Sequence, residues 1–381
     1  MYSSLTENLM SKTFFVDGTD YSSRNPLIIA ELGTSHNADL SKAKEMASAA
    51  ANSGANCVKF QMVFADEILH PNTGEVSLPG GKLKLYDMFK QLEVKPEFYA
   101  EMKEYVESLR LLFLCTPFGL KSAKLLKELH PKIVKIASPE LNYTALLREI
   151  AGWGLPTLLS TGVSRLGDIE EAIMGFRVWG MGSPEPCILH CVTSYPAPET
   201  DYNLRVLQSL ASVFGVSVGV SDHSLDPGLV PSLAICQGAA VIEKHFCLSR
   251  DDPGLDDPIA LPPREFALMC KLIRRAAETG AEQTIADISR DRGASLVEAV
   301  LGNGVKTLAP SEQDNYERTN RSLHALRDIK PGEIIKAEDF AVLRTEKILR
   351  PGLAPSWAQR VCGRTARQFI PAGQGIRFED I

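Results

Sequence analysis

The stretch SVGVSDHSLDPGLVPSLAICQGAAVIEKHF, residues 217–246, decides the fold. It contains two β-branched runs, 217–222 and 240–246, and the apolar stretch between them predicts one helix. Two strands joined by one helix predict a parallel pair with a right-handed crossover. His223 follows the first run and His245 lies near the end of the second, so we expect both imidazoles at the same edge of the sheet.

The same alternation of strand and helix extends over most of the chain. Helix candidates separate the runs, as in residues 40–54, where apolar positions recur at helical spacing and Gly54 ends the stretch. Eight such units in about 250 residues predict a closed (β/α)8 barrel rather than an open doubly wound sheet. The predicted strands are residues 27–32, 56–61, 112–118, 133–138, 157–162, 186–191, 217–222 and 240–246.

Polar and ionisable residues lie where nearly every predicted strand ends. Contact with solvent would explain polar strand ends, but it does not explain lysines and histidines inside apolar runs. Barrel active sites lie at the carboxyl ends of the strands, so this pattern favours an enzyme. The residues are Glu31, Lys59, Gln61, Thr116, Lys135, Ser138, Glu140, Ser160, Tyr195, Ser221, His223 and His245.

Composition limits the classes of partner. A formal charge of −6 argues against broad binding to nucleic acid or an anionic membrane, although it leaves room for a local basic pocket. The first fifteen residues lack the pattern of a signal peptide, and no apolar run is long enough to span a bilayer. The eight cysteines predict reduced core thiols in a cytoplasmic protein, and for Cys187 and Cys191 we favour core packing over a metal pair.

Breaks in the pattern predict four segments. Residues 1–22 form an extension in which FFVDGTDYS predicts a hairpin with Asp-Gly at its turn. Residues 23–285 form the barrel, with an insertion over 62–111 whose turn-rich stretch HPNTGEVSLPGG we expect to fold over the site. Residues 286–320 are polar and turn-rich and predict a linker, and residues 321–381 form a second domain.

The last sixty residues contain an internal repeat. IKPGEIIKAEDF, from Ile329, and IPAGQGIRFEDI, from Ile370, share an isoleucine, a glycine three residues later, an isoleucine six residues later and a Glu-Asp pair. Two similar short β units predict a compact pseudo-symmetric β domain. Because so small a domain has a limited core, we expect it to pack against a barrel, its own or a partner's.

The chain resembles the sialic acid synthase family over nearly its whole length. The matching motifs are AELGTSHNADL, VKFQ, CTPF, KIASPEL, LSTGVS, LHCVTSYPAP, VGVSDHSLDPG, EKHF and DDPGLD, and the C-terminal repeat is similar to that family's antifreeze-like domain. The resemblance implies a (β/α)8 TIM barrel followed by a small β-rich antifreeze-like domain. It also implies a synthase that condenses phosphoenolpyruvate with an N-acylated mannosamine-type sugar, giving a nine-carbon 2-keto acid and phosphate.

The resemblance assigns roles to the polar strand ends. Phosphoenolpyruvate is strongly anionic and needs cations and hydroxyl donors. Its pocket would be lined by Lys59, Thr116, Lys135, Ser138, Ser160 and Ser221. An internal ion pair of the two lysines with Glu31 or Glu140 is compatible with that role.

By the same resemblance, His223 and His245 would bind Mn²⁺ or Mg²⁺, an ion that polarises the aldehyde of the sugar. The resemblance also implies a domain-swapped homodimer, in which an arginine of the antifreeze-like domain reaches the sugar. Arg344 and Arg350 are the candidates, and the Arg-Pro-Gly context favours Arg350. The sugar would contact Glu31, Gln61, Tyr195, Asp256 and Arg350, and the catalytic groups would be Glu31, Lys59, Lys135 and Glu140.

Two departures from the family pattern lie near the presumed substrates. Pro139 stands in ASPE where the family often has GSGE, and Thr193 stands where it often has asparagine. They leave the acceptor sugar open, and synthases of legionaminic or pseudaminic acid share most of these motifs. Two other functions stay open: an aldolase that forms a Schiff base at Lys135 or Lys59, and an inactive barrel that binds carbohydrate.

Overall fold

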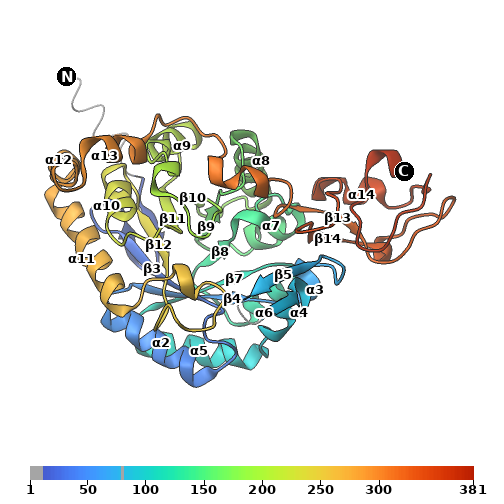
Figure 1. Cartoon of the computed structure of the whole chain (residues 1–381), viewed down its shortest axis with the longest axis horizontal. Coiled ribbons are helices and arrows are strands. Elements are labelled where there is room, and N and C mark those ends of the chain that lie inside the picture. The colour runs from blue at the N-terminus through green and yellow to red at the C-terminus, as the bar shows by residue number, and fades with distance from the viewer. Residues whose placement is uncertain (1–11, 79–80) are drawn as a thin grey trace.

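Eight parallel strands form the barrel that the alternation predicts (Figure 1). The structure is a computed structural model that describes residues 12–78 and 81–381. Residues 1–11, in which we predict no signal peptide, lie outside the described ranges. The sheet order is β7-β4-β3-β12-β11-β10-β9-β8, and β7 and β8 at its two ends lie side by side, so the sheet nearly closes. The strands are β3 (Leu27–Gly33), β4 (Cys57–Met62), β7 (Leu112–Pro117), β8 (Val134–Ile136), β9 (Thr157–Ser160), β10 (Cys187–Cys191), β11 (Val218–Asp222) and β12 (Val241–His245).

A helix follows each barrel strand and covers its outer face. Residues 40–52 form the predicted helix before Gly54, capped by the Asp39 side chain, which accepts hydrogen bonds from the backbone of Ser41 and Lys42. The strand–helix order confirms the TIM-barrel prediction. The covering helices are α2 (Leu40–Asn52), α5 (Pro96–Ser108), α6 (Leu120–Glu128), α7 (Thr144–Ala151), α8 (Leu166–Trp179), α9 (Val206–Phe214), α10 (Leu229–Cys236) and α11 (Pro263–Thr279).

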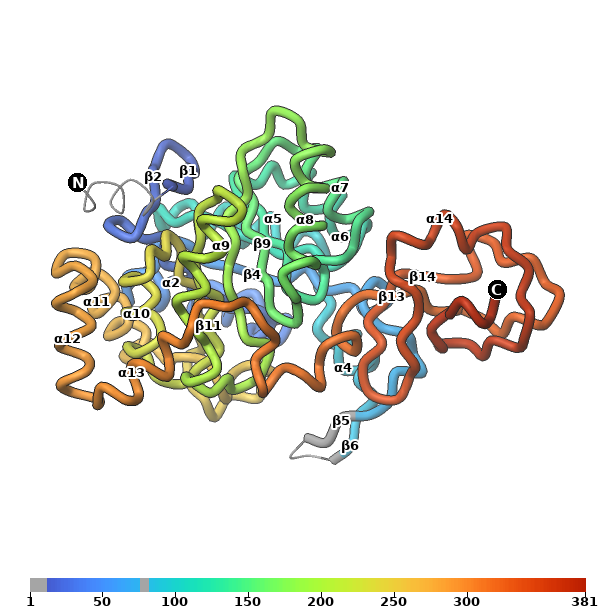
Figure 2. The backbone as a smooth tube through the Cα atoms, turned by 90° about the horizontal axis from the view of Figure 1, so that it is seen from above, coloured from blue at the N-terminus to red at the C-terminus, as the bar shows by residue number. Residues whose placement is uncertain are grey.

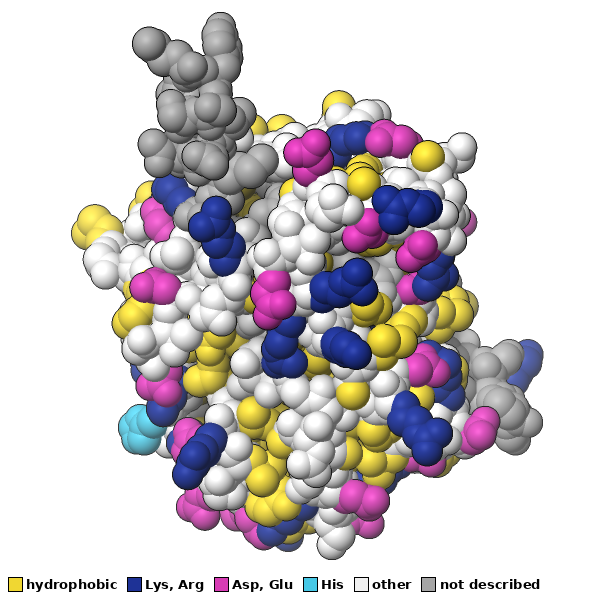
Figure 3. Space-filling model, turned by 90° about the vertical axis from the view of Figure 1, so that its left-hand side faces the viewer, with side chains coloured by type: hydrophobic (Ala, Val, Ile, Leu, Met, Phe, Trp, Pro, Cys, Tyr) yellow, Lys and Arg dark blue, Asp and Glu magenta, His cyan; other side chains and the backbone are white. Residues whose placement is uncertain are grey.

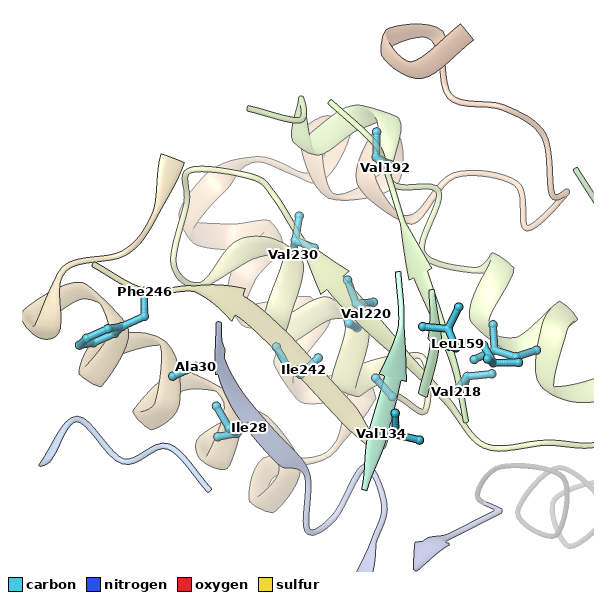
Figure 4. Close-up of a cluster of buried hydrophobic side chains, with 14 of the residues drawn as sticks. Ile28, Ala30, Val134, Leu159, Val192, Val218, Val220, Val230, Ile242 and Phe246 are labelled. Atoms are coloured by element: carbon cyan, nitrogen blue, oxygen red, sulfur yellow. The ribbon is translucent and has the colours of Figure 1, made fainter. Parts of the chain in front are cut away.

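The two-residue period of the strands sorts their side chains into an outer and an inner set. On β3 and β12, Ile28, Ala30 and Ile242 pack outward against the helices, as Figure 4 shows. The residues between them point inward, where the barrel interior has two layers. Residues near the strand starts, such as Leu27 and Ile29, form an apolar lower layer. Residues near the strand ends form a polar upper layer.

The predicted N-terminal hairpin closes the lower end of the barrel. Strands β1 (Phe14–Val16) and β2 (Thr19–Tyr21) pair antiparallel. Asp17 and Gly18 at the turn both have positive φ, which a two-residue turn of this kind requires. Phe14 and Val16 are buried in one cluster with the lower layer of the barrel. The hairpin prediction is therefore confirmed.

The insertion after β4 contacts the C-terminal domain. It contains α3 (Ala65–Ile68), β5 (Glu75–Leu78), β6 (Gly81–Lys84) and α4 (Leu85–Gln91). Its turn-rich stretch, of which residues 79–80 lie outside the described ranges, meets that domain. Asn72 Nδ2 donates to the Ala372 carbonyl at 3.2 Å, and the Ile348 N–H donates to the Thr73 carbonyl at 3.3 Å.

The range predicted as a linker, 286–320, is largely structured. Its first part belongs to α12 (Ala281–Arg292) and α13 (Ala294–Leu301). Val297, Val300 and Leu301 are buried at helical spacing and join the barrel core, so the segment is held by packing. Only 302–320 lacks longer helices, and Figure 2 shows this part running along the barrel toward β13.

The C-terminal domain has the internal symmetry that its repeat predicts. Ile329 and Ile370, the first residues of the two repeats, exchange two backbone hydrogen bonds of 2.9 Å. Each repeat ends in a short 3-10 turn whose aspartate binds an arginine: Asp339 binds Arg327 at 2.7 Å, and Asp380 binds Arg350 at 2.5 Å. The elements are β13 (Arg321–Ala325), η5 (Ala337–Asp339), β14 (Phe340–Arg344), η6 (Pro355–Trp357), α14 (Ala358–Val361) and η7 (Phe378–Asp380).

The face of the barrel around α11 and α12 has a mixed surface. In Figure 3 basic and acidic side chains are interspersed there, and the hydrophobic side chains are scattered. Some of the charges pair, as Arg290 does with Asp287 at 3.2 Å and Arg292 with Asp226 at 3.0 Å. Within residues 12–78 and 81–381, no helix has the length and apolar content needed to cross a bilayer.

Candidate active site

The barrel brings the predicted site residues to one rim. They lie on the strands or on the loops that follow the carboxyl ends of the strands, and the strands are parallel and in similar register. Those on strands are Glu31 on β3, Lys59 and Gln61 on β4, Thr116 on β7, Lys135 on β8, Ser160 on β9, Ser221 on β11 and His245 on β12. Those on the loops are Ser138 and Glu140 in η1 (Ser138–Glu140), Tyr195 after β10, His223 directly after β11, and Asp256 before η3 (Asp257–Ile259).

Two lysines and two carboxylates form a buried network across the upper layer. Lys59 Nζ lies 2.6 Å from Glu31 and 3.5 Å from Glu243, and Lys135 Nζ lies 2.6 Å from the same Glu243 oxygen. Ser221 Oγ donates to this oxygen at 2.9 Å. The predicted ion pair of Lys59 with Glu31 is therefore present, whereas the partner of Lys135 is Glu243 instead of Glu140.

Burial and charge act in opposite directions on these groups. Burial lowers the pKa of Lys135, an effect that outweighs the attraction of Glu243. Burial also disfavours charged Lys59, but Glu243 and Glu31 together raise the pKa of that lysine above its usual value. For Glu243 itself, burial favours the neutral acid, yet the two lysines hold the pKa of the carboxyl well below its usual range. Glu243 is therefore charged and binds two cationic side chains.

Two buried hydroxyls of the same layer lack a partner among the described residues. They are Thr116 Oγ1 and Ser160 Oγ, whose side chains are buried in the barrel. An unpaired buried hydroxyl is costly, and such groups in native proteins usually meet a ligand or water. Together with the lysines, these donors suit an anion that enters the upper layer.

The two histidines face each other at the edge of this network. Their ring centroids are 5.4 Å apart, and Tyr195 stacks on His223 at 4.3 Å. His223 Nδ1 lies 2.8 Å from the Val192 carbonyl. Because a carbonyl only accepts, Nδ1 carries a proton, and Nε2 is the ring nitrogen left to bind a metal. His245 Nδ1 lies 3.7 Å from an Asp256 oxygen, and burial with nearby Glu31 raises the pKa of Asp256 to about 6.

An ion pair on the outer face aligns the two histidines. Lys244, directly before His245, lies 2.6 Å from Asp222, directly before His223, and both side chains are fully buried. Lys244 also donates to the carbonyl of Ser224. The pair joins β11 to β12 one residue below each imidazole, so it fixes their relative height.

These imidazoles fit a divalent ion. Burial, together with the charge of Lys59, holds the pKa of His245 well below its usual range, so the ring is neutral as a metal ligand must be. The described residues place no third His, Cys, Asp or Glu with them as a ready ligand set. Water and substrate oxygens would have to complete the coordination, as an open Lewis-acid site requires.

Glu140 is held by two arginines of the C-terminal domain. Its Oε1 accepts from Arg321 at 2.8 Å and from Arg344 at 2.8 Å, and the Glu140 and Arg321 side chains are fully buried. Arg350 does not reach this rim within the chain. Its guanidinium is held in its own domain by Asp380, at 2.5 Å, and by the Gly375 carbonyl at 3.0 Å.

Sequence reasoning missed two of these residues. Glu243 lies in the motif EKHF and could have been found from the sequence. It is two positions before His245 on a buried strand, so its side chain points to the same inward face as that histidine. Arg321 gave no comparable signal. It lies in a polar stretch, and only the docking of β13 on the barrel brings it to Glu140 and to the Phe118 carbonyl, at 2.6 Å.

An eight-stranded α/β barrel with buried charges at the carboxyl rim defines a TIM-barrel enzyme. Residues 46–284 match the NeuB family and residues 320–381 match the SAF domain. The chain belongs to the NeuB family and carries a SAF domain, which places it in the class of nonulosonic acid synthases.

Relatives of known name or structure match over nearly their full lengths. The N,N'-diacetyllegionaminic acid synthase of Legionella pneumophila is 34% identical over 94% of this chain and 96% of its own. The pseudaminic acid synthase of Campylobacter jejuni is 32% identical over 93% and 96%. The crystal structure of the spore coat polysaccharide biosynthesis protein spsE from Bacillus subtilis superposes with a TM-score of 0.80 at 31% identity, covering 97% of this chain and 99% of that one.

Proposed function

We propose that the protein condenses phosphoenolpyruvate with an N-acylated hexosamine, releasing phosphate and forming a nine-carbon 2-keto sugar acid. The observation that carries the proposal is the buried upper layer, where Lys59 and Lys135 lie beside the unpaired hydroxyls of Thr116 and Ser160. A small anion with two charged groups matches this set of cations and donors. Membership of the NeuB family supports the same reaction.

In this proposal the lysines and hydroxyls bind the phosphate and carboxylate of phosphoenolpyruvate. Its C3 attacks the aldehyde of the open-chain sugar, water adds at C2, and the C–O bond to phosphate breaks. Glu31 and Glu140 lie beside this space, and each is held by cationic side chains. Carboxylates in these positions can orient sugar hydroxyls or transfer protons. A divalent ion bound by His223 and His245, Mn²⁺ or Mg²⁺, would polarise the aldehyde.

The sugar would lie on the side of the rim that carries Gln61, Tyr195 and Asp256. Gln61 Nε2 donates to Glu31 at 2.6 Å, so Glu31 lies between Lys59 and the sugar side. Among the arginine candidates, the contact of Arg344 with Glu140 favours Arg344. The named relatives make different nonulosonic acids, so the acyl groups of the acceptor are the variable part of this proposal.

A panel of N-acylated hexosamines tests the proposal. Purified protein is incubated with phosphoenolpyruvate, Mn²⁺ and one sugar at a time, and released phosphate is measured. We expect release only with N-acylmannosamine-type sugars or their diacylated relatives. Release without sugar, or no release with any member, would refute the proposal. The domain-swapped dimer is tested separately by light scattering, where a monomeric mass would refute it.

The Schiff-base aldolase makes an opposite prediction. Burial lowers the pKa of Lys135, and a lower pKa favours the neutral, nucleophilic amine that a Schiff base requires. The close contact of Lys135 with Glu243 opposes it, because it holds the ammonium form. Borohydride reduction with pyruvate, followed by mass spectrometry, decides: an adduct on Lys135 would support the aldolase, and the condensing synthase predicts none.

A further inference from the structure

The segment between the helices and the C-terminal domain, residues 302–320, bonds to two loops of the active-site rim. One loop follows β9 over 161–165, and the other follows β10 over 192–196. Four side chains of the segment hold backbone groups of these loops. Lys306 Nζ donates to the Thr161 carbonyl at 3.1 Å, Asn320 Nδ2 to Val163 at 3.1 Å, Asn315 Nδ2 to Thr193 at 2.9 Å, and Glu312 accepts from both Val163 and Thr193.

Glu312 is the centre of this contact. Its side chain lies in η4 (Pro310–Asn315) and only 1% of the residue is exposed. One oxygen accepts the N–H of Val163 at 2.9 Å and of Thr193 at 3.0 Å, and the other accepts the N–H of Ala309 at 3.1 Å. A buried carboxylate needs such donors to offset its lost hydration. Glu312 thus joins two loops that belong to different strands.

The loop after β9 has a conformation that needs support. Val163 has a φ of 42°, in the left-handed region that β-branched residues rarely adopt. Such conformations persist when the surroundings hold them. The N–H of Val163 donates to Glu312, and the carbonyl of Val163 accepts from Asn320. Both backbone groups of this residue are therefore bonded to the segment 302–320.

The two loops carry or adjoin groups proposed to bind substrate. Gly162, between Ser160 and Val163, donates its N–H to Ser138 Oγ at 3.0 Å. The two loops pack closely here, because a Cβ added to Gly162 would lie 2.2 Å from Thr193 Oγ1. On the other loop, Tyr195 follows Thr193 by two residues and stacks on His223. A shift of the loop after β9 would therefore disturb Ser160 and Ser138, and a shift of the loop after β10 would move Tyr195.

We infer that Glu312 is a positioning residue of the active site, which holds the loops after β9 and β10 so that Ser138, Ser160 and Tyr195 meet the substrates correctly. It touches no reacting atom and acts through Val163 and Thr193. The inference rests on the proposed function, because it assumes that these loops bind phosphoenolpyruvate and the sugar. Glu312 would thus be a residue outside the barrel strands and their loops that contributes to the geometry of the active site.

Three variants test this role. Glu312→Ala removes all three hydrogen bonds, whereas Glu312→Gln keeps one oxygen that can accept from both loops and loses only the bond to Ala309. Asp314→Ala, an exposed carboxylate two residues away, is the matched control. Phosphate release gives kcat and KM, and calorimetry with phosphoenolpyruvate alone gives its Kd.

We expect Glu312→Ala to weaken kcat/KM for phosphoenolpyruvate about 100-fold, the order of loss that a 1 Å misplacement of binding groups produces. Its KM and Kd should both rise. Glu312→Gln should restore both to within about 3-fold of wild type, because one hydrogen bond is lost instead of three. Asp314→Ala should match wild type.

A role in folding alone gives a different result. It would reduce the amount of active protein, lowering the apparent kcat with KM and Kd unchanged, and that outcome for Glu312→Ala overturns the inference. If Glu312→Ala does not fold, Asn315→Ala removes only the side-chain bond to the Thr193 carbonyl, and an unchanged KM for the sugar in that variant overturns it. Wild-type protein that binds phosphoenolpyruvate but turns over no sugar would refute the proposed function and leave the Kd comparison intact.

Discussion

Replacing Glu243 by glutamine should destabilise the protein, because it removes one charge from a closed buried network. Glu243 contacts Lys135 at 2.6 Å and Lys59 at 3.5 Å, and all three side chains are at most 5% exposed. The amide keeps the shape but leaves Lys135 without its anionic partner. Removing one member of a buried ion pair costs about 3–5 kcal/mol. For a chain of 381 residues, an unfolding entropy of about 0.8 kcal/mol per kelvin converts this cost into a Tm lower by about 4–6 °C.

Phosphoenolpyruvate should act more strongly on the variant than on wild type. Without Glu243 the pocket has an excess of positive charge, and an anionic ligand would compensate for the missing carboxylate. We therefore expect the rise in Tm on adding saturating phosphoenolpyruvate to be larger in Glu243→Gln. The assay is thermal unfolding of both proteins with and without the ligand. Glu107→Gln is the control, because it breaks a solvent-accessible pair with Lys103, whose worth is about 0–1 kcal/mol.

Two results would refute this reasoning. If Glu243→Gln melts at the same temperature as Glu107→Gln, the buried network does not carry the stability assigned to it. If the ligand raises the Tm of Glu243→Gln no more than that of wild type, Lys59 and Lys135 are not the cations that bind phosphoenolpyruvate.

Three further predictions concern the active-site rim and the hairpin below the lower layer of the barrel. His223→Ala and His245→Ala should each abolish phosphate release in Mn²⁺ while keeping the wild-type circular dichroism spectrum, and near-normal turnover in either would argue against the metal site. Arg344→Ala should raise the sugar KM about 10-fold, the effect of losing one charge-assisted contact, whereas Arg350→Ala should leave it unchanged; the reverse pattern would reinstate Arg350. Phe14→Ala should cost about 3–5 kcal/mol of stability in urea unfolding with kcat/KM unchanged, and a cost below about 1 kcal/mol would mean that the hairpin does not seal the barrel.

The barrel and most of its rim could be predicted because they follow from local periodicity. A strand's two-residue repeat fixes which side chains share the interior, so the spacing of Lys59 and Gln61, or of Ser221 and His223, is enough to place each pair on one face. Parallel strands then bring these faces to one rim. The same rule would have found Glu243, two residues before His245, had the inward face been followed backwards from the histidine.

The contacts from the C-terminal third could not be predicted in this way. Arg321, Arg344 and Glu312 reach the rim only because separate elements dock on the barrel, and docking depends on the shapes of two surfaces that no repeat in the sequence encodes. The polar composition of residues 286–320 also gave no sign of the helices in this range. Residues 294–301 bury Val297 and Val300 under an otherwise polar stretch, so packing outweighs the appearance of a linker.

In the two-layered barrel interior, the residues that stabilise the strands are largely different from the residues that contact the substrates. Most of the charged and hydroxyl groups of the upper layer stand on strands whose lower half is anchored among apolar side chains such as Leu27 and Leu189. Outside the buried network of Lys59, Lys135, Glu31 and Glu243, a substitution above the lower layer alters what the pocket recognises without loosening the strand that carries it. Substitutions that change the acceptor sugar can therefore accumulate at little cost to the stability of the barrel. We expect the lower layer and the hairpin to vary less in sequence between enzymes of different specificity than the rim does.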